Sequence, residues 1–297
     1  MRLPIRSLAG LTALALALAA CGGGAAPASP SVAPQPSPDT STYWLRASTF
    51  QAIPPANLFG IAPSALITGD GTWITQGPIP AIYPGPLLPN LVGRTVSADA
   101  ATRVLAEAQR LGLLGERTEF LDGPALPGGV TGRIELTVDG ERRTLTGDPG
   151  AVMQCITTPC DPEPGSAQAF ADFWARLQNP ESWLTEGLGA QEPYVADRYA
   201  LLIGPAPVPD PALPGASAPL DWPLDDPVAT FGEPVGNNQF RCGVVEGDDA
   251  AAFRPLFEGA NQLSQWVEDP SMSATFGVTV RPFVPGEDPC AETFGAG

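Results

Sequence analysis

Apolar and polar positions alternate in several short stretches of this chain, and each such stretch predicts a β-strand. Single strand-like runs cover residues 43–50, 199–203 and 276–280. Two further stretches fold back on themselves, one at 64–76 around Asp70-Gly71 and one at 134–146 around Asp139-Gly140. Asp-Gly between alternating apolar runs is the pair that a tight hairpin turn prefers, so both stretches predict β-hairpins.

Apolar residues at helical spacing mark two well-bounded helices. The first follows Ser97 and stops at Gly112. The second starts at Ser166 and ends before Pro180. Serine accepts a hydrogen bond from the free backbone N–H groups of a first turn, whereas glycine and proline end helices, so these residues predict the helix boundaries.

A third helix is expected from about Asp248 to Val267, with Asp248 and Asp249 at its N-cap. Pro255 lies inside this span, so the helix is either kinked there or divided in two. The preceding segment, residues 205–234, contains nine prolines and reads as a linker or a wrapping loop. Its large aromatic residues, Trp222 and Phe231, favour wrapping, because flexible linkers rarely carry such side chains.

The order hairpin, loop and Ser-capped helix occurs twice, which predicts an α+β fold. We expect an antiparallel or mixed sheet with helices packed on one face, and the repeated unit allows an internal duplication. Three regions follow from this order: a main α+β region at 42–204, the Pro-rich crossover at 205–234, and a C-terminal β-α-β region at 235–297.

The first residues read as an export signal. Arg2 and Arg6 precede an uncharged apolar run that reaches Ala20, which predicts a signal peptide at residues 1–20. The following Cys21, after Leu18-Ala19-Ala20, resembles the lipobox of bacterial lipoproteins, in which a diacylglyceryl group is attached to the cysteine. A plain signal peptide beside a chance cysteine is the alternative. Residues 21–41 are rich in Pro, Ala and Ser and predict a lipidated cysteine followed by a disordered tether.

Charge and composition exclude several kinds of chemistry. The formal net charge is −17, the chain has no histidine, and all 15 basic residues are arginine. Such an acidic chain repels nucleic acid, so nucleic acid is not an expected partner. Without histidine or lysine there is no imidazole base, no Ser-His or Cys-His pair, no Schiff-base lysine and no phosphate-loop lysine. We therefore expect no cofactor and lean against an enzyme.

Four cysteines besides Cys21 predict two structural disulfides in an exported chain. Three pairings are open, and we favour Cys155–Cys160 across a short turn and Cys242–Cys290 near the C-terminus. A zinc site would need two close pairs, and only one close pair exists.

Any catalysis would have to rest on carboxylates, and three acidic loops are candidates. They are Asp221 with Asp225 and Asp226, Glu246 with Asp248 and Asp249, and Glu287 with Asp288. A glycosidase would need two carboxylates that face each other across a cleft. None of the loops has the spacing of a calcium loop, so no metal site is expected. Solvated turns and a helix N-cap are the simpler interpretation of all three.

The turn from Gln154 to Asp161 is rich in β-branched residues and carries the short cysteine pair. Rigid loops of this kind occur in exported protease inhibitors, because rigidity reduces the entropy lost on binding. An ordinary stapled turn is the alternative.

Several short motifs resemble those of a group of uncharacterised lipoproteins from GC-rich bacteria. Besides the lipobox and the tether, they are Tyr83-Pro84-Gly85-Pro86-Leu87-Leu88-Pro89, Trp222-Pro223-Leu224, Ala229-Thr230-Phe231-Gly232, Arg241-Cys242-Gly243-Val244-Val245 and Arg281-Pro282-Phe283-Val284-Pro285-Gly286-Glu287. The resemblance implies the same cellular location and the same fold. It does not identify any functional residue.

Taken together, these patterns predict a lipid-anchored, extracytoplasmic binding or interaction module of the bacterial cell envelope. Its membrane contact would be the lipid on Cys21, and its partner would be an envelope protein or a ligand that the sequence does not identify. A carboxylate-dependent hydrolase and a protease-inhibitor-like module are the alternatives.

Overall fold

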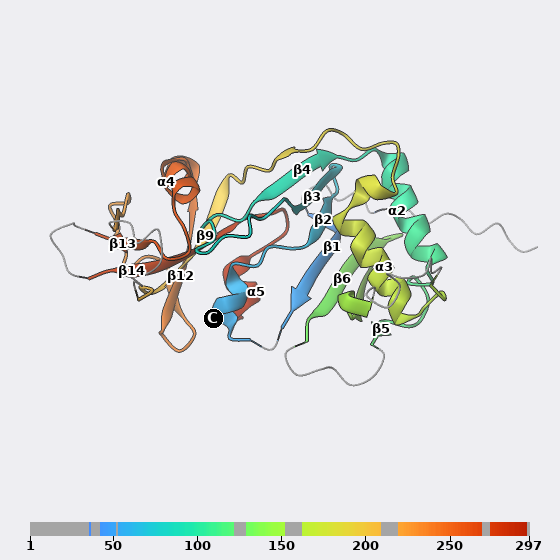
Figure 1. The fold of residues 1–297 in the computed structure, drawn as a ribbon, viewed down its shortest axis with the longest axis horizontal. Coiled ribbons are helices and arrows are strands. Elements are labelled where there is room, and N and C mark those ends of the chain that lie inside the picture. Colours follow the sequence, from blue (N-terminus) through green and yellow to red (C-terminus); the bar gives the residue numbers. More distant parts are fainter. Residues whose placement is uncertain are drawn as a thin grey trace, which may run out of the picture. The chain divides into compact units, whose positions relative to one another are not determined.

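The structure is a computed structural model that describes residues 36, 42–51, 53–121, 129–151, 162–208, 219–268 and 274–295. These residues belong to one unit, which runs from Pro34 to Gly297. Strands form two sheets and helices pack against their faces, so the fold is α+β, as the sequence predicted (Figure 1).

The first sheet has eight strands in the order β5-β7-β6-β1-β2-β3-β4-β8. Its pairs are antiparallel except for β5 and β7, which are parallel. The strands are β1 (Tyr43–Phe50), β2 (Ala65–Thr68), β3 (Thr72–Gln76), β4 (Leu91–Thr95), β5 (Glu119–Phe120), β6 (Thr131–Val138), β7 (Glu141–Gly147) and β8 (Glu192–Pro193).

The second sheet has six strands in the order β10-β13-β14-β9-β12-β11. It is antiparallel except for the pair of β10 and β13. The strands are β9 (Arg198–Pro205), β10 (Leu220–Asp221), β11 (Glu233–Val235), β12 (Phe240–Glu246), β13 (Gln265–Val267) and β14 (Phe276–Pro282). The sequence assigned β9 to the first region, but the structure makes it an inner strand of the second sheet.

Besides 3₁₀ geometry at residues 149–151, the described part of the chain contains five α-helices and a further 3₁₀ turn. They are α1 (Pro55–Phe59), α2 (Ala98–Arg110), α3 (Ala167–Gln178), the 3₁₀ turn Pro180–Ser182, α4 (Gly247–Gly259) and α5 (Pro289–Phe294). Ser97 and Ser166 cap α2 and α3, because their side chains accept hydrogen bonds from the Ala100 and Ala169 N–H groups.

Both predicted hairpins are present, and they flank β1. The hairpin β2–β3 pairs with one edge of β1, and the hairpin β6–β7 pairs with the other. The helices that follow the two hairpins, α2 and α3, cover the same face of this sheet (Figure 1). Phe170 of α3 packs so closely on β7 that a side chain at Gly147 would collide with its ring. The two hairpin–helix units are not equal, since β4 separates hairpin and helix only in the first.

Aromatic packing fixes α4 on one face of the second sheet. Phe253 and Phe257 of α4 contact Trp266 of β13, and Trp222 packs edge-on against Phe231 as well as Phe253. The described part of the crossover, residues 219–234, therefore wraps over the fold. On the opposite face, Phe59 of α1 joins Ala200 and Leu202 in a separate apolar cluster.

The third predicted helix is too long. It ends at Gly259, and residues 265–267 form β13. Side-chain hydrogen bonds form a turn that ends the helix: the Ser264 hydroxyl accepts from the Asn261 N–H, and the side-chain Oδ1 of Asn261 accepts from the Leu263 N–H. Pro255 lies inside the single helix α4, and Glu246 occupies the N-cap position in place of Asp248 or Asp249.

Candidate binding site

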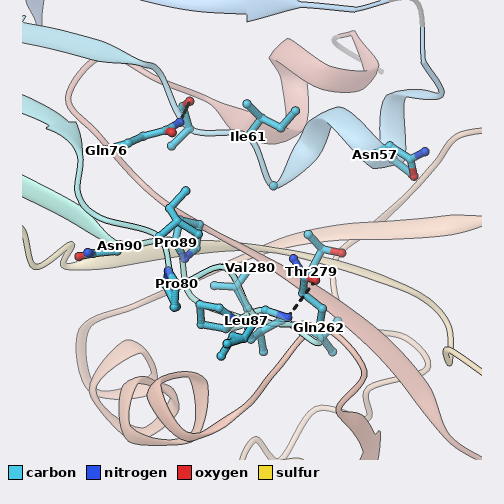
Figure 2. A pocket seen from close by; sticks show the side chains of 18 residues that line it. Asn57, Ile61, Gln76, Pro80, Leu87, Pro89, Asn90, Gln262, Thr279 and Val280 are labelled. Atoms are coloured by element: carbon cyan, nitrogen blue, oxygen red, sulfur yellow. Dashed lines mark hydrogen bonds between the residues drawn. The ribbon is translucent and has the colours of Figure 1, made fainter. Parts of the chain in front are cut away.

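A cavity of about 630 Å³ lies where α1, residues 77–90 and β14 meet. Figure 2 shows Asn57 and Ile61 on one side of it and Leu87 and Gln262 on the other, with Thr279 of β14 beside Gln262. No charged residue is among the residues that line it. Its volume falls within the range of small-ligand pockets.

Residues 77–90, called here the proline loop, form the outer wall of this cavity. Five of its residues are prolines, so it contains no regular strand or helix. Residues 78–83 are all exposed and uncharged. Three of their side chains are large and apolar, namely Ile79, Ile82 and Tyr83, which are 66%, 64% and 62% exposed. Exposed apolar runs of this kind mark contact sites for other molecules.

Backbone hydrogen bonds hold the proline loop at both ends and leave its tip exposed. At one end the Gly77 N–H donates to the Asn90 carbonyl at 2.9 Å. At the other end the Leu87 N–H donates to Ala260 and the Gln262 N–H donates to Gly85, at 3.1 and 3.0 Å. Leu87 is buried there and joins the α4 core. The two ends of the proline loop are therefore held in place, while its tip remains exposed to solvent.

Carboxamide side chains supply most of the polar lining. Gln76 Nε2 donates to the Ala62 carbonyl at 3.1 Å, and Gln262 Oε1 accepts from the Gly85 N–H at 3.3 Å. Each of these bonds occupies one end of an amide group, which fixes the side chain. Among the described residues, Gln76 Oε1, Gln262 Nε2 and the Asn57 amide have no hydrogen-bond partner. The cavity therefore offers neutral donors and acceptors between apolar walls.

A second cluster of polar residues is closed off from solvent. Arg46 of β1 donates to Glu287 Oε1 at 2.7 Å and to Glu292 Oε2 at 2.6 Å. Arg281 of β14 donates to the same Glu287 oxygen at 2.5 Å. The Glu287 side chain is fully buried, so its carboxylate lies between two guanidinium groups from different sheets.

The charge balance of this cluster indicates a structural role. Burial raises the pKa of Glu287 above its ordinary value, while Arg281 and Arg46 act to lower it. Burial also acts to lower the pKa of Arg46, but the bonds to Glu292 and the charge of Glu287 outweigh it and raise that pKa. Since arginine cannot give up its proton at ordinary pH, this site lacks a usable acid–base pair.

The prediction that Glu287 is a solvated loop residue is therefore wrong. Glu287 is buried by a tertiary contact, because the turn after β14 folds back between the two sheets and contacts Arg46 there. Its neighbour Asp288 caps α5 by accepting from the Ala291 N–H. The remaining candidate acids, Asp221, Asp225, Asp226, Glu246, Asp248 and Asp249, are exposed. Glu246 lines a cavity with Asp197, and it is paired with Arg198 at 3.1 Å.

Cys242 and Cys290 form a disulfide that joins β12 to α5, with an S–S distance of 2.02 Å. This is the pairing favoured from the sequence. Cys21, Cys155 and Cys160, the tether and the turn 154–161 lie outside the described residues, so their predicted roles stay predictions. Within the described ranges, no group of three metal-ligating side chains comes together, and no helix is long and apolar enough to cross a membrane.

The sequence pattern did not single out the proline loop as a site, although the run from Pro78 to Tyr83 carries a usable signal. Large apolar residues among prolines cannot join a sheet or a helix, so they must either cover a core or remain exposed.

The chain matches no known protein family, no curated protein and no solved structure.

Proposed function

We propose that this chain is a binding module of the bacterial cell envelope, held at the membrane by a lipid on Cys21. Its binding site is the cavity beneath the proline loop together with the exposed tip of that loop. The observation that supports this function most directly is the uncharged lining of the cavity in a chain of net charge −17. A surface without charge and with exposed Ile79, Ile82 and Tyr83 suits an uncharged partner that covers apolar area.

Site-specific crosslinking in the producing cells tests this proposal. A photoreactive amino acid replaces Ile82 at the loop tip and, as a matched control, Glu141 at the exposed turn of β6–β7. Position 82 should crosslink to a discrete partner that position 141 does not capture. The partner is then identified by mass spectrometry, purified and titrated against the protein.

A cavity-filling variant links that binding to the cavity itself. Asn57 is exposed at the rim, so Asn57→Trp should fill the opening without disturbing the core. Gln109→Trp on the exposed face of α2 is the control for a surface tryptophan. We expect Asn57→Trp to weaken binding at least about tenfold, which corresponds to one well-buried contact. Equal crosslinking at both positions, or unchanged affinity of Asn57→Trp, would refute the proposed site.

A further inference from the structure

One edge of β14 is unpaired where it borders the cavity. On its other edge, β14 pairs with β9 along its whole length, from Phe276 opposite Pro205 to Pro282 opposite Tyr199. On the cavity edge, β13 pairs with β14 only as far as Gly277. Val278, Thr279 and Val280 then line the cavity, and no strand of the described chain continues the ladder beside them.

The direction of the backbone groups follows from the antiparallel register. The Phe283 N–H donates to the Arg198 carbonyl at 3.0 Å, so this residue pair is hydrogen-bonded. Hydrogen-bonded and non-hydrogen-bonded pairs alternate, which places Thr279 in a bonded pair with Leu202 of β9. Val278 and Val280 fall in the other class, and their N–H and C=O groups point away from β9. The pair of Gln265 and Gly277 directs the Val278 N–H to Ser264 on the β13 side, so Val280 is the residue whose N–H and C=O groups face the cavity.

The backbone groups of Val280 have no hydrogen-bond partner among the described residues. Val280 is only 1% exposed, so these groups lie at a recessed edge and not on the open surface. Buried backbone N–H and C=O groups are almost always paired, and an unpaired one costs about as much as a lost hydrogen bond. A free strand edge in a recess is therefore a site for an added strand.

The walls of the cavity limit what can reach this edge. Gly60 of the α1 end lies against Thr279 on one face of β14, and Leu87 belongs to the same apolar cluster as Val278 and Val280 on the other. These walls leave access to a single extended segment and hinder a second folded sheet. The chain's own tether is a poor occupant, because residues 21–41 carry prolines at 27, 30, 34, 36 and 38 that cannot donate to a ladder.

We infer that an extended, uncharged segment of a partner protein enters this cavity and adds to β14 as a strand. The inference rests on the proposed function, since it names the partner of the same site. Main-chain hydrogen bonds to the N–H and C=O groups of Val280 give the affinity. The carboxamides of Gln262, Gln76 and Asn57 bind neutral polar groups of the segment, and the absence of charge in the lining selects against charged side chains.

A displayed library of random nonapeptides, selected on the full-length protein, provides the probe. The selected sequences should be poor in charged residues and in proline. The best peptide is then made in two forms, N-methylated at alternate residues in one or the other phase. N-methylation removes a donor but keeps the side chain, so only the phase that faces β14 should lose affinity, by about tenfold or more. Asn57→Trp should abolish binding of the unmodified peptide, and Gln109→Trp should not.

Amide hydrogen exchange of the protein measures the same contact. Exchange at Val280 should slow at least about tenfold when the peptide binds, because its N–H gains a partner. Exchange at Thr279 serves as the internal control, since its N–H already faces β9.

The outcomes separate this inference from the proposed function. If position 82 crosslinks to a partner but both N-methylated forms bind equally, the binding module stands and strand addition is refuted. A library that yields no binder, or only charged or Pro-rich ones, also refutes it. A dimer of the protein that Asn57→Trp dissociates would make a second copy the occupant and overturn the inference.

Discussion

Nη2 of Arg46 lies 2.7 Å from Oε1 of Glu287, across 241 positions of the chain. Arg281 reaches the same oxygen, so one buried carboxylate connects β1 of the first sheet with β14 of the second. Breaking a buried ion pair costs far more than forming one gains, because the remaining charge stays desolvated. The link between the two sheets is therefore sensitive to single substitutions.

Arg281→Met should be strongly destabilising. It leaves the buried Glu287 with one of its two cations, and we expect a loss of about 3–5 kcal/mol in the free energy of unfolding. Arg254→Met removes an exposed pair with Glu258 on α4 and should cost within about 1 kcal/mol. Urea denaturation at neutral pH compares the two variants. Equal losses would contradict a special role of the buried cluster.

The same variant should respond to pH. Burial already raises the pKa of Glu287, and removing Arg281 takes away the larger of two lowering influences, so the pKa rises further. A carboxyl group whose pKa is raised by folding stabilises the fold while protonated and loses that contribution as pH rises through the raised pKa. The deficit of Arg281→Met should therefore grow as the pH is raised from below 4.5, the ordinary pKa of the group, toward neutrality. A deficit that shrinks over this range would show that the sign is wrong.

The hydrogen-bonded hydroxyl of Tyr194 should make the protein less stable at alkaline pH. Its hydroxyl donates to the Phe283 carbonyl at 3.0 Å. Burial, followed by the charge of Asp197, raises the pKa of Tyr194 from 10 to about 12. The hydrogen bond contributes fully below pH 10 and is lost as the phenol ionises toward pH 12. Tyr194→Phe should cost about 1 kcal/mol at pH 8, and this deficit relative to the wild type should shrink as the pH is raised from 10 toward 12.

The control for this titration is Tyr83→Phe at the exposed loop tip. It should leave the unfolding free energy unchanged over the whole pH range, because the Tyr83 ring is largely solvated. If Tyr83→Phe reproduces the effect of Tyr194→Phe, the buried hydroxyl is not its cause.

The Cys242–Cys290 disulfide should contribute more to stability than the predicted Cys155–Cys160 disulfide, which would close only a short ring. Cys242 and Cys290 are 48 positions apart, and the chain-entropy estimate for such a loop is roughly 4 kcal/mol. Cys290→Ser should lower the melting temperature more than Cys160→Ser, whose predicted ring spans a short turn. The exported protein should also show no free thiol among Cys155, Cys160, Cys242 and Cys290. The reverse order of melting temperatures would count against this pairing.

The predicted attachment to the membrane is tested at Cys21. Mass spectrometry of the mature N-terminus should find a diacylglyceryl cysteine. Cys21→Ser should release the protein from the membrane or leave it unprocessed, because the acyl chains are its expected anchor. Normal cleavage and membrane retention of the serine variant would rule out the lipobox.

Local signals explain the parts of the fold that the sequence predicted. The Asp139-Gly140 turn has positive φ at both residues, which this pair accepts readily, and the cap of α2 depends on Ser97 alone. Both features involve a few neighbouring residues, so they can be recognised without knowledge of the rest of the chain.

The candidate site depends on contacts between distant parts of the chain, and these could not be predicted. The cavity needs Gln262 beside Gly85 and β14 beside α1, and its free edge exists because β13 pairs with β14 only as far as Gly277 of β14. The sequence pattern around Gln265 resembles the end of a helix, since Trp266 continues the apolar spacing of α4. Likewise, nothing near Glu287 indicates that Arg46 will bury it.

The contact between Arg46 and Glu287 also bears on the order of events during synthesis. The closest ionic partners of Arg46 in the first strand are Glu287 and Glu292, which are synthesised 241 and 246 positions later. The disulfide partner of Cys242 is equally late. A nascent chain can form the β2–β3 hairpin and α2 early, but Arg46 stays without these anions until residues 287 and 292 have been synthesised. A chain truncated before Pro285 would lack the late residues that join its two sheets.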